Sequence, residues 1–358
     1  MTAPPTVRVH AADAWWANTP SQDPRIPIRA DARFVDALRR SGATLAVASR
    51  QDSVLFLLSA ADGACTASAI GVAAPMGLAA GGDAFAVGSA LSIRVYRDLT
   101  ADDASKATYF PVASHVTGAV SVHELGWDGD GGLWFVNTAF SALCRTDAAS
   151  HFRIEWQPDF LVEHGPLDCC HLNGMAMEAS GPRYATALAA TGTREGWRAR
   201  GPDEGVLIDV AQGAVLRDLS MPHSPTLHRD AVWLLESGRG RCLRYSPRDG
   251  RAETVCEIPG IARGLDFVDT LAFVGMSKIR ASSGAVADTL RQRFPEHPHC
   301  RIYAMDAATG ETHGYAELPR ISEISSIRAL PKPYVRVLQP DNAQTAATYV
   351  YRPLYASS

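Results

Sequence analysis

One pattern of short apolar segments recurs along this chain at intervals of about 40 to 50 residues. Its units begin near Met76, His123, His171, His223 and Gly264, so successive intervals are 47, 48, 52 and 41 residues. Each unit has a polar strand start, a turn with Gly or Asp, and apolar strands in the same order. Because self-similarity at this period is typical of four-stranded propeller blades, the repeat predicts a β-propeller.

The apolar runs themselves have the length of strands and lie between clusters of Gly, Asp, Pro and Ser. Regularly spaced short strands between turn signals indicate an all-β protein. Only residues 37–42 and 287–294 have a helical pattern. A pair of β-sandwiches is the competing architecture, and the regular period favours the propeller. The expected strands are 44–49, 53–59, 84–89, 133–138, 206–210, 231–237, 271–277 and 301–306.

Segments near the two ends of the chain are expected to form one blade together. Residues 321–331 read as an inner strand without outer strands, and residues 44–63 as outer strands with a weak inner partner. Joining them in one blade closes the ring and removes both free sheet edges. We therefore predict a single six-bladed propeller, with seven blades as the alternative. Its expected limits are 34–335, with an N-terminal extension (1–33) packed on it and a C-terminal tail (336–358).

Composition excludes several classes of partner. The 358 residues are 46% hydrophobic and 20% charged, and the net charge of −4 predicts neither a nucleic-acid nor a membrane partner. No apolar run approaches the roughly 18 residues that span a bilayer, and no signal-peptide pattern begins the chain. The seven cysteines lack CxxC spacing, which predicts free thiols and a cytoplasmic location. A small molecule or a peptide remains as the expected ligand.

Several long motifs resemble a bacterial family of conserved propeller-like proteins that is labelled only as a domain of unknown function. They include "VHEL" (122–125), "CHLNGMAM" (170–177), "SMPHSP" (220–225), "WLLESGRG" (233–240) and "RGLDF" (263–267). Members of that family are sometimes fused to tetratricopeptide or sulfotransferase modules. The resemblance extends from Phe34 to Pro331 and implies the propeller fold, but no particular reaction.

His123, His171 and His223 are the strongest candidates for a functional site. Inner strands of a propeller surround a central channel, so residues at matching positions of successive blades lie close together. Three neutral imidazoles at about 2.0–2.2 Å suit a divalent transition metal and leave coordination positions open. We expect iron first, with copper, zinc or manganese as alternatives. The competing interpretation is that each histidine only caps a loop by bonding backbone carbonyls.

The same register points to further channel residues. Glu323, Arg263 and Asp266 are the candidates for catalysis, with Glu323 as a fourth ligand or general base. Asn173 is expected on the channel face two residues beyond His171, and Glu124 is expected to support the ligands from behind.

Two basic residues beyond the inner strands complete the candidates. Lys278 and Arg280 are expected to clamp a substrate carboxylate, together with Asn173 as substrate-binding residues.

These residues predict a metal-dependent enzyme that performs an oxidative, dioxygen-using modification of a small molecule or peptide. One alternative is a manganese- or zinc-dependent lyase or hydrolase with Glu323 as the base. The other is a non-catalytic propeller that binds a protein or peptide.

Overall fold

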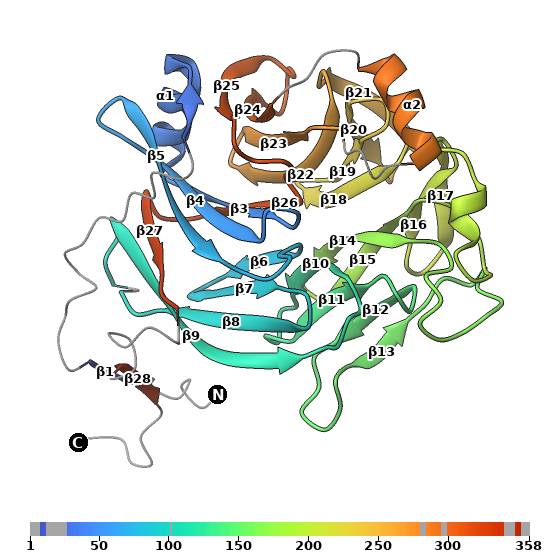
Figure 1. Ribbon diagram of the computed structural model, residues 1–358, viewed down its shortest axis with the longest axis horizontal. Helices are drawn as coiled ribbons and strands as arrows, with labels where there is room; N and C mark the ends of the chain where they lie inside the picture. Colours follow the sequence, from blue (N-terminus) through green and yellow to red (C-terminus); the bar gives the residue numbers. More distant parts are fainter. Residues whose placement is uncertain are drawn as a thin grey trace.

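Short antiparallel strands joined by tight turns build the protein, which we describe from a computed structural model. The structure describes residues 8–11, 27–100, 102–279, 284–294, 299–339 and 348–351. Six sheets of four or five strands stand in a ring within this part of the chain (Figure 1). The predicted six-bladed propeller is thus confirmed.

Blades 1 to 3 each use four consecutive strands, and blade 1 gains a fifth, parallel strand from the C-terminal region. Blade 1 comprises β6 (Leu78–Gly81), β7 (Ala84–Gly88), β8 (Ser92–Asp98), β9 (Lys106–Val116) and β27 (Tyr334–Val337). Blade 2 comprises β10 (Val122–Trp127), β11 (Leu133–Asn137), β12 (Ala142–Arg145) and β13 (Arg153–Trp156). Blade 3 comprises β14 (Leu172–Glu178), β15 (Gly181–Ala187), β16 (Gly205–Asp209) and β17 (Gly213–Leu219), with the 3₁₀ helix η2 (Gly196–Ala199) between β15 and β16.

Blades 4 and 5 follow the same plan. Blade 4 comprises β18 (Pro222–His228), β19 (Ala231–Glu236), β20 (Arg241–Ser246) and β21 (Arg251–Glu257). Blade 5 comprises β22 (Ile261–Val268), β23 (Leu271–Ser277), β24 (Cys300–Asp306) and β25 (Thr312–Leu318), and the short β2 (Arg29–Ala30) pairs with its outer edge. Separately, β1 (Arg8–Ala11) pairs with β28 (Thr348–Tyr351).

Blade 6 closes the ring with both ends of the chain. Its inner strand is β26 (Ser326–Leu330), which pairs antiparallel with β3 (Thr44–Ser49), followed by β4 (Val54–Ala61) and β5 (Ala64–Gly71). Each inner strand contacts the next around the channel, and β26 contacts both β22 and β6 (Figure 1). This is the closure that the incomplete terminal segments predicted.

The hydrophobic core lies between the blades. Each neighbouring pair of blades shares its own cluster of buried side chains. The cluster between blades 5 and 6 also takes in helix α1 (Ala32–Ser41), whose Phe34 meets Phe273 edge to face at 6.4 Å. Because apolar burial is concentrated between the sheets, the channel is left for polar side chains.

Two α-helices accompany the propeller in the described part of the chain, near the two segments where the sequence predicted helical turns. Helix α1 is capped by Asp31, whose carboxylate accepts from the Phe34 amide, and ends at Gly42 in the left-handed conformation. Helix α2 (Gly284–Arg293) lies between β23 and β24. Neither described helix is long and apolar enough to cross a membrane.

Four successive inner strands share a β-bulge near their start. The pairing shifts between Val122 and Leu125 in β10, Leu172 and Gly174 in β14, His223 and Thr226 in β18, and Ala262 and Leu265 in β22. A bulge breaks the strict alternation of side chains and re-aims the residues within it. The candidate site residues His123, Asn173, His223 and Arg263 lie in or at the edge of these bulges.

Candidate functional site

The loop that leads into the inner strand has the same backbone shape in blades 2, 3 and 4. Ser121, His171 and Met221 all have left-handed φ values, of 54°, 52° and 50°. These three residues follow one another at intervals of 50 residues. The residues three positions earlier, Gly118, Asp168 and Asp218, are left-handed as well. The structural repeat of these blades is therefore 50 residues.

This register corrects one prediction. His123 and His223 occupy the same position, 100 residues apart, and the residue midway between them is Asn173 rather than His171. His171 matches Ser121 and Met221, so the prediction that all three histidines share one position is wrong. The imidazoles of His123 and His171 nevertheless lie together, with ring centres 5.1 Å apart at an angle of 81°.

Fixed acceptors hold the Nδ1 atom of His123. The Ser121 carbonyl oxygen lies 3.2 Å from it and the Thr138 hydroxyl 2.6 Å from it. Thr138 also donates its only hydroxyl proton to the carbonyl of Leu172, at 2.7 Å, so the hydroxyl oxygen accepts from His123. Nδ1 therefore carries the proton, and Nε2 is the basic nitrogen of the ring.

His223, two blades further on, is held by the same arrangement of hydrogen bonds. Its Nδ1 lies 2.9 Å from the Met221 carbonyl and 3.0 Å from the Ser237 hydroxyl. Ser237 donates to the Ala262 carbonyl at 2.5 Å, as Thr138 does to the carbonyl of Leu172. The tautomer is again the one with its lone pair on Nε2.

His171 is oriented by a carboxylate. Its Nδ1 lies 3.0 and 3.2 Å from the two oxygens of Asp168, three residues earlier. Trp197, from η2 in the β15–β16 connection, packs on the imidazole with ring centres 4.4 Å apart. The Arg198 guanidinium lies over the indole, also at 4.4 Å. Loop residues of blade 3 thus cover the ring that their own inner strand presents.

The environment keeps His123 neutral. Burial, with the nearby His171, Arg263 and His223, holds the pKa of the His123 imidazole well below its ordinary value. A neutral imidazole is the form that binds a metal ion. Within the described residues, however, no group of three or more His, Cys, Asp or Glu side chains is gathered closely enough to hold one.

Two of the predicted catalytic residues form a buried ion pair. The Arg263 guanidinium donates to the Glu323 carboxylate at 2.8 Å, and their side chains are only 8% and 2% exposed. Arg263 comes from the bulge of β22, and Glu323 from the segment before β26. The pair joins blades 5 and 6 at the channel. A role for Glu323 as general base stays a prediction.

Asp266 belongs to a different group. Arg328 of β26 lies 3.4 Å from Asp266 and 3.4 Å from Glu124, and Asp266 also accepts from the Ala329 amide at 2.7 Å. Burial raises the pKa of Glu124 to about 7, against the opposing effect of the Arg328 guanidinium. Glu124 thus supports the channel through Arg328. The catalytic role of Asp266 is untested.

The three predicted substrate-binding residues differ in where they lie in the structure. Asn173 is buried, its side-chain oxygen accepts from Thr186 at 2.7 Å, and its Nδ2 has no partner among the described residues. Lys278 is half-buried directly after β23. Arg280 lies outside the described residues.

Sequence reasoning missed the residues that orient the rings. Thr138 and Ser237 each directly follow the second strand of a blade, in "FVNT" and "LLES". Both blades that carry a histidine at the matching position also carry a hydroxyl residue directly after their second strand. This recurrence in the sequence could have indicated that the hydroxyl orients the histidine. Nothing local to Trp197 or Arg328 indicates that either reaches the channel.

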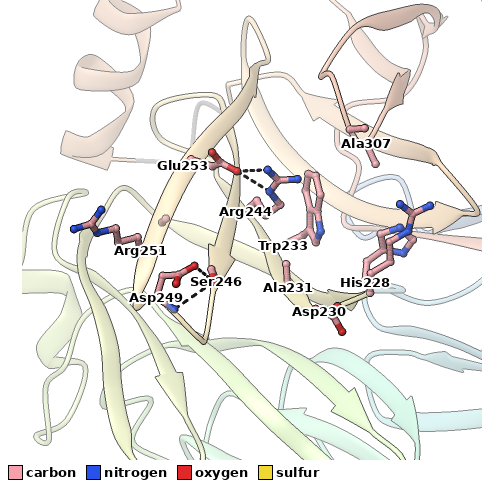
Figure 2. A pocket seen from close by; sticks show the side chains of 13 residues that line it. His228, Asp230, Ala231, Trp233, Arg244, Ser246, Asp249, Arg251, Glu253 and Ala307 are labelled. Carbon is pink, nitrogen blue, oxygen red and sulfur yellow. Dashed lines mark hydrogen bonds and ion pairs between the residues drawn. The ribbon is translucent and has the colours of Figure 1, made fainter.

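A hollow of about 940 Å³ lies elsewhere, between the outer strands of blade 4 and blade 5 (Figure 2). His228 faces it and stacks on Phe267 with ring centres 4.1 Å apart. Figure 2 shows Arg244 paired with Glu253, and Ser246 bonded to Asp249. Four of its polar side chains are thus engaged in two pairs, and the His228 ring stacks on Phe267 while its Nε2 has no hydrogen-bond partner among the described residues.

Fold and site together define a six-bladed β-propeller whose channel is approached by histidines from three successive blades. The chain belongs to the family described as "Domain of unknown function (DUF4915)", whose family model matches residues 32–337. The resemblance that the motifs indicated is confirmed.

Solved structures share the fold at low sequence identity. A chain of "Crystal structure of Nidogen/Laminin Complex" has a TM-score of 0.55 and 12% identity, covering 81% of this chain and 100% of that chain. "Streptogramin B lyase structure" has a TM-score of 0.41 and 14% identity, covering 75% and 74%. No curated protein matches the chain. At these identities the likeness to the first structure concerns the fold alone.

Proposed function

We propose that the channel binds one divalent transition metal through the Nε2 atoms of His123, His171 and His223. The observation that carries this proposal is the fixed Nδ1 atom of each ring, held by a carbonyl and a hydroxyl or by a carboxylate. Metal-binding histidines almost always donate their other ring N–H to such a partner, which sets the tautomer and the ring orientation. A histidine that only caps its loop would also bond a backbone carbonyl, so the distinguishing contacts are the added hydroxyls of Thr138 and Ser237 and the carboxylate of Asp168.

Ring spacing supports the same proposal. Two imidazoles that bind one ion at about 2.1 Å have ring centres about 5 Å apart. His123 and His171 have this spacing, at 5.1 Å. His223 also contributes to the lowered pKa of His123, which supports a third imidazole in the same part of the channel. Binding the ion would draw the three Nε2 atoms onto it by small side-chain rotations.

Three neutral nitrogens leave coordination positions open for substrate and dioxygen, which suits iron first and copper, zinc or manganese as alternatives. We propose an oxidative modification of a small molecule or peptide. The Arg263–Glu323 pair disfavours a lyase or hydrolase with Glu323 as base, because that carboxylate would have to leave a buried guanidinium. In the proposed site Asn173 offers its side-chain N–H to a bound oxygen.

The test is metal content. Untagged protein is reconstituted anaerobically with Fe(II), and in parallel with Cu(II), Zn(II) or Mn(II), then desalted and measured by inductively coupled plasma mass spectrometry. We expect about one ion per chain for at least one metal. His123→Ala, His171→Ala and His223→Ala should each lower the affinity by at least about tenfold, whereas His228→Ala should not.

Two results would overturn the proposal. One is less than about 0.1 ion per chain with every metal. The other is full metal content in His223→Ala with an unchanged melting temperature. Either result would favour the alternative of a non-catalytic propeller that binds a protein or peptide.

A further inference from the structure

We infer that the other mouth of the channel is a second binding site, which takes a small neutral molecule with an apolar body and a carbonyl oxygen. This inference is independent of the proposed metal. It rests on a hollow of about 650 Å³ that is lined by residues from all six blades, mostly on their inner strands and in the turns that follow them. Cofactor and ligand sites commonly occupy cavities of this size.

Most residues that line this hollow are small or apolar, and polar atoms supply about half of its exposed surface. Ala79, Ala80 and Gly81 of blade 1 face Met175 and Met177 of blade 3 and Leu227 of blade 4. Small side chains leave the space open, and methionine adapts its shape to different ligands. The wall therefore suits an apolar body of no fixed shape.

Two N–H donors of the lining have no acceptor among the described residues. They are Nε1 of Trp127, at the end of β10, and Nε of Arg328, on the inner strand of blade 6. A buried donor without a partner costs about 1–3 kcal/mol. A ligand oxygen that reaches either group recovers part of that free energy, so the site favours a molecule that brings hydrogen-bond acceptors.

Charged side chains of both signs line the hollow, namely Arg97 and Arg328 with Asp128, Glu178 and Asp266. Two carboxyl groups, those of Glu124 and Asp266, flank the Arg328 guanidinium at 3.4 Å each. An incoming anion would meet these carboxyl groups, and an incoming cation would meet the guanidinium. A neutral carbonyl avoids both repulsions and still accepts a hydrogen bond.

The experiment uses three probes of one size. Binding of N-acetyl-L-leucinamide (neutral), N-acetyl-L-leucine (anion) and L-leucinamide (cation) to the full-length protein is measured by saturation-transfer-difference NMR. The measurements are made at about pH 6.5, below the α-amino pKa of about 8. We expect the neutral probe to bind at least about tenfold more tightly than either ion, because the lining carries guanidinium and carboxyl groups together and either ion would meet a like charge.

Two pairs of variants locate the site. Ala179→Trp fills the hollow at an exposed hairpin and should abolish binding, whereas Ala308→Trp, in the hollow of Figure 2, should not. Trp127→Phe keeps an aromatic ring, though a smaller one, and removes the N–H donor, so it should weaken binding about three- to tenfold, whereas Trp233→Phe, the same change outside this hollow, should leave binding unchanged. The inference is overturned if no probe binds, if an ion binds as well as the amide, or if Ala179→Trp binds normally.

Discussion

Thr138 fixes the His123 ring, with its hydroxyl oxygen 2.6 Å from Nδ1 and its proton given to the Leu172 carbonyl at 2.7 Å. Leu172 belongs to the next blade, so the hydroxyl links the imidazole of blade 2 to the inner strand of blade 3. Ser237 makes the equivalent link between His223 and Ala262. The orientation of both rings thus depends on contact between neighbouring blades.

Replacing Thr138 by Val keeps the side-chain shape and removes this hydroxyl. We expect Thr138→Val to lower metal affinity about 10- to 100-fold, because the supporting partner of a ligand is lost. Competition with a coloured chelator measures the affinity. Thr138→Ser should restore most of it, since serine provides the same hydroxyl. An unchanged affinity in Thr138→Val would show that the hydroxyl does not position His123 for a metal.

The buried pair of Arg263 and Glu323 leads to a prediction about stability. Glu323→Gln should reduce the free energy of unfolding by about 3–5 kcal/mol, because it removes a charged partner of the buried Arg263 guanidinium. The double change Arg263→Met with Glu323→Leu should recover most of this loss, since both charges of the pair are then replaced by apolar side chains. Urea unfolding measures both. A loss below about 0.5 kcal/mol in Glu323→Gln would contradict the prediction.

Closure of the ring by β26 can be tested with one buried side chain. Ile327, 1% exposed, packs between blades 5 and 6. Ile327→Ala should destabilise the protein by about 2–5 kcal/mol, as large-to-small changes in a core do. Ile154→Ala, on the outer strand β13 and 42% exposed, should cost no more than about 0.5 kcal/mol.

Truncation gives the same test in a stronger form. A chain that ends at Arg320 lacks β26 and leaves β3 without its inner partner. We expect it to lose cooperative thermal unfolding, as followed by circular dichroism. A single sharp transition at the parental temperature would contradict closure by the C-terminal strand.

Two half-buried cysteines should differ in reactivity. A hydrogen bond from Cys242, its partner across β20 and β21, lowers the pKa of Cys256, whereas burial raises the pKa of Cys65 to about 12. The thiolate is the reactive form, so at neutral to mildly alkaline pH iodoacetamide should alkylate Cys256 first. Peptide mass spectrometry of the native protein gives both rates, and Cys256→Ser identifies the peptide. Equal rates would contradict the shift at Cys256.

Much of the fold was predictable because the signals are local. The predicted strands at 44–49 and 271–277 have the observed limits, since a short apolar run between turn residues needs no distant information. The incomplete segments at the two ends predicted the shared blade, because an inner strand without outer partners must pair elsewhere.

The sequence by itself determined the propeller, its closure, and the shared position of His123 and His223. Only the tertiary structure decided that His171 approaches from a position two residues earlier, through a left-handed backbone. It also decided that Thr138 and Ser237 orient the rings, that Trp197 covers one of them, and that Arg328 gathers Glu124 and Asp266. The physical reason is range: strand formation follows from neighbouring residues, whereas these contacts depend on how loops and blades far apart in the chain are brought together.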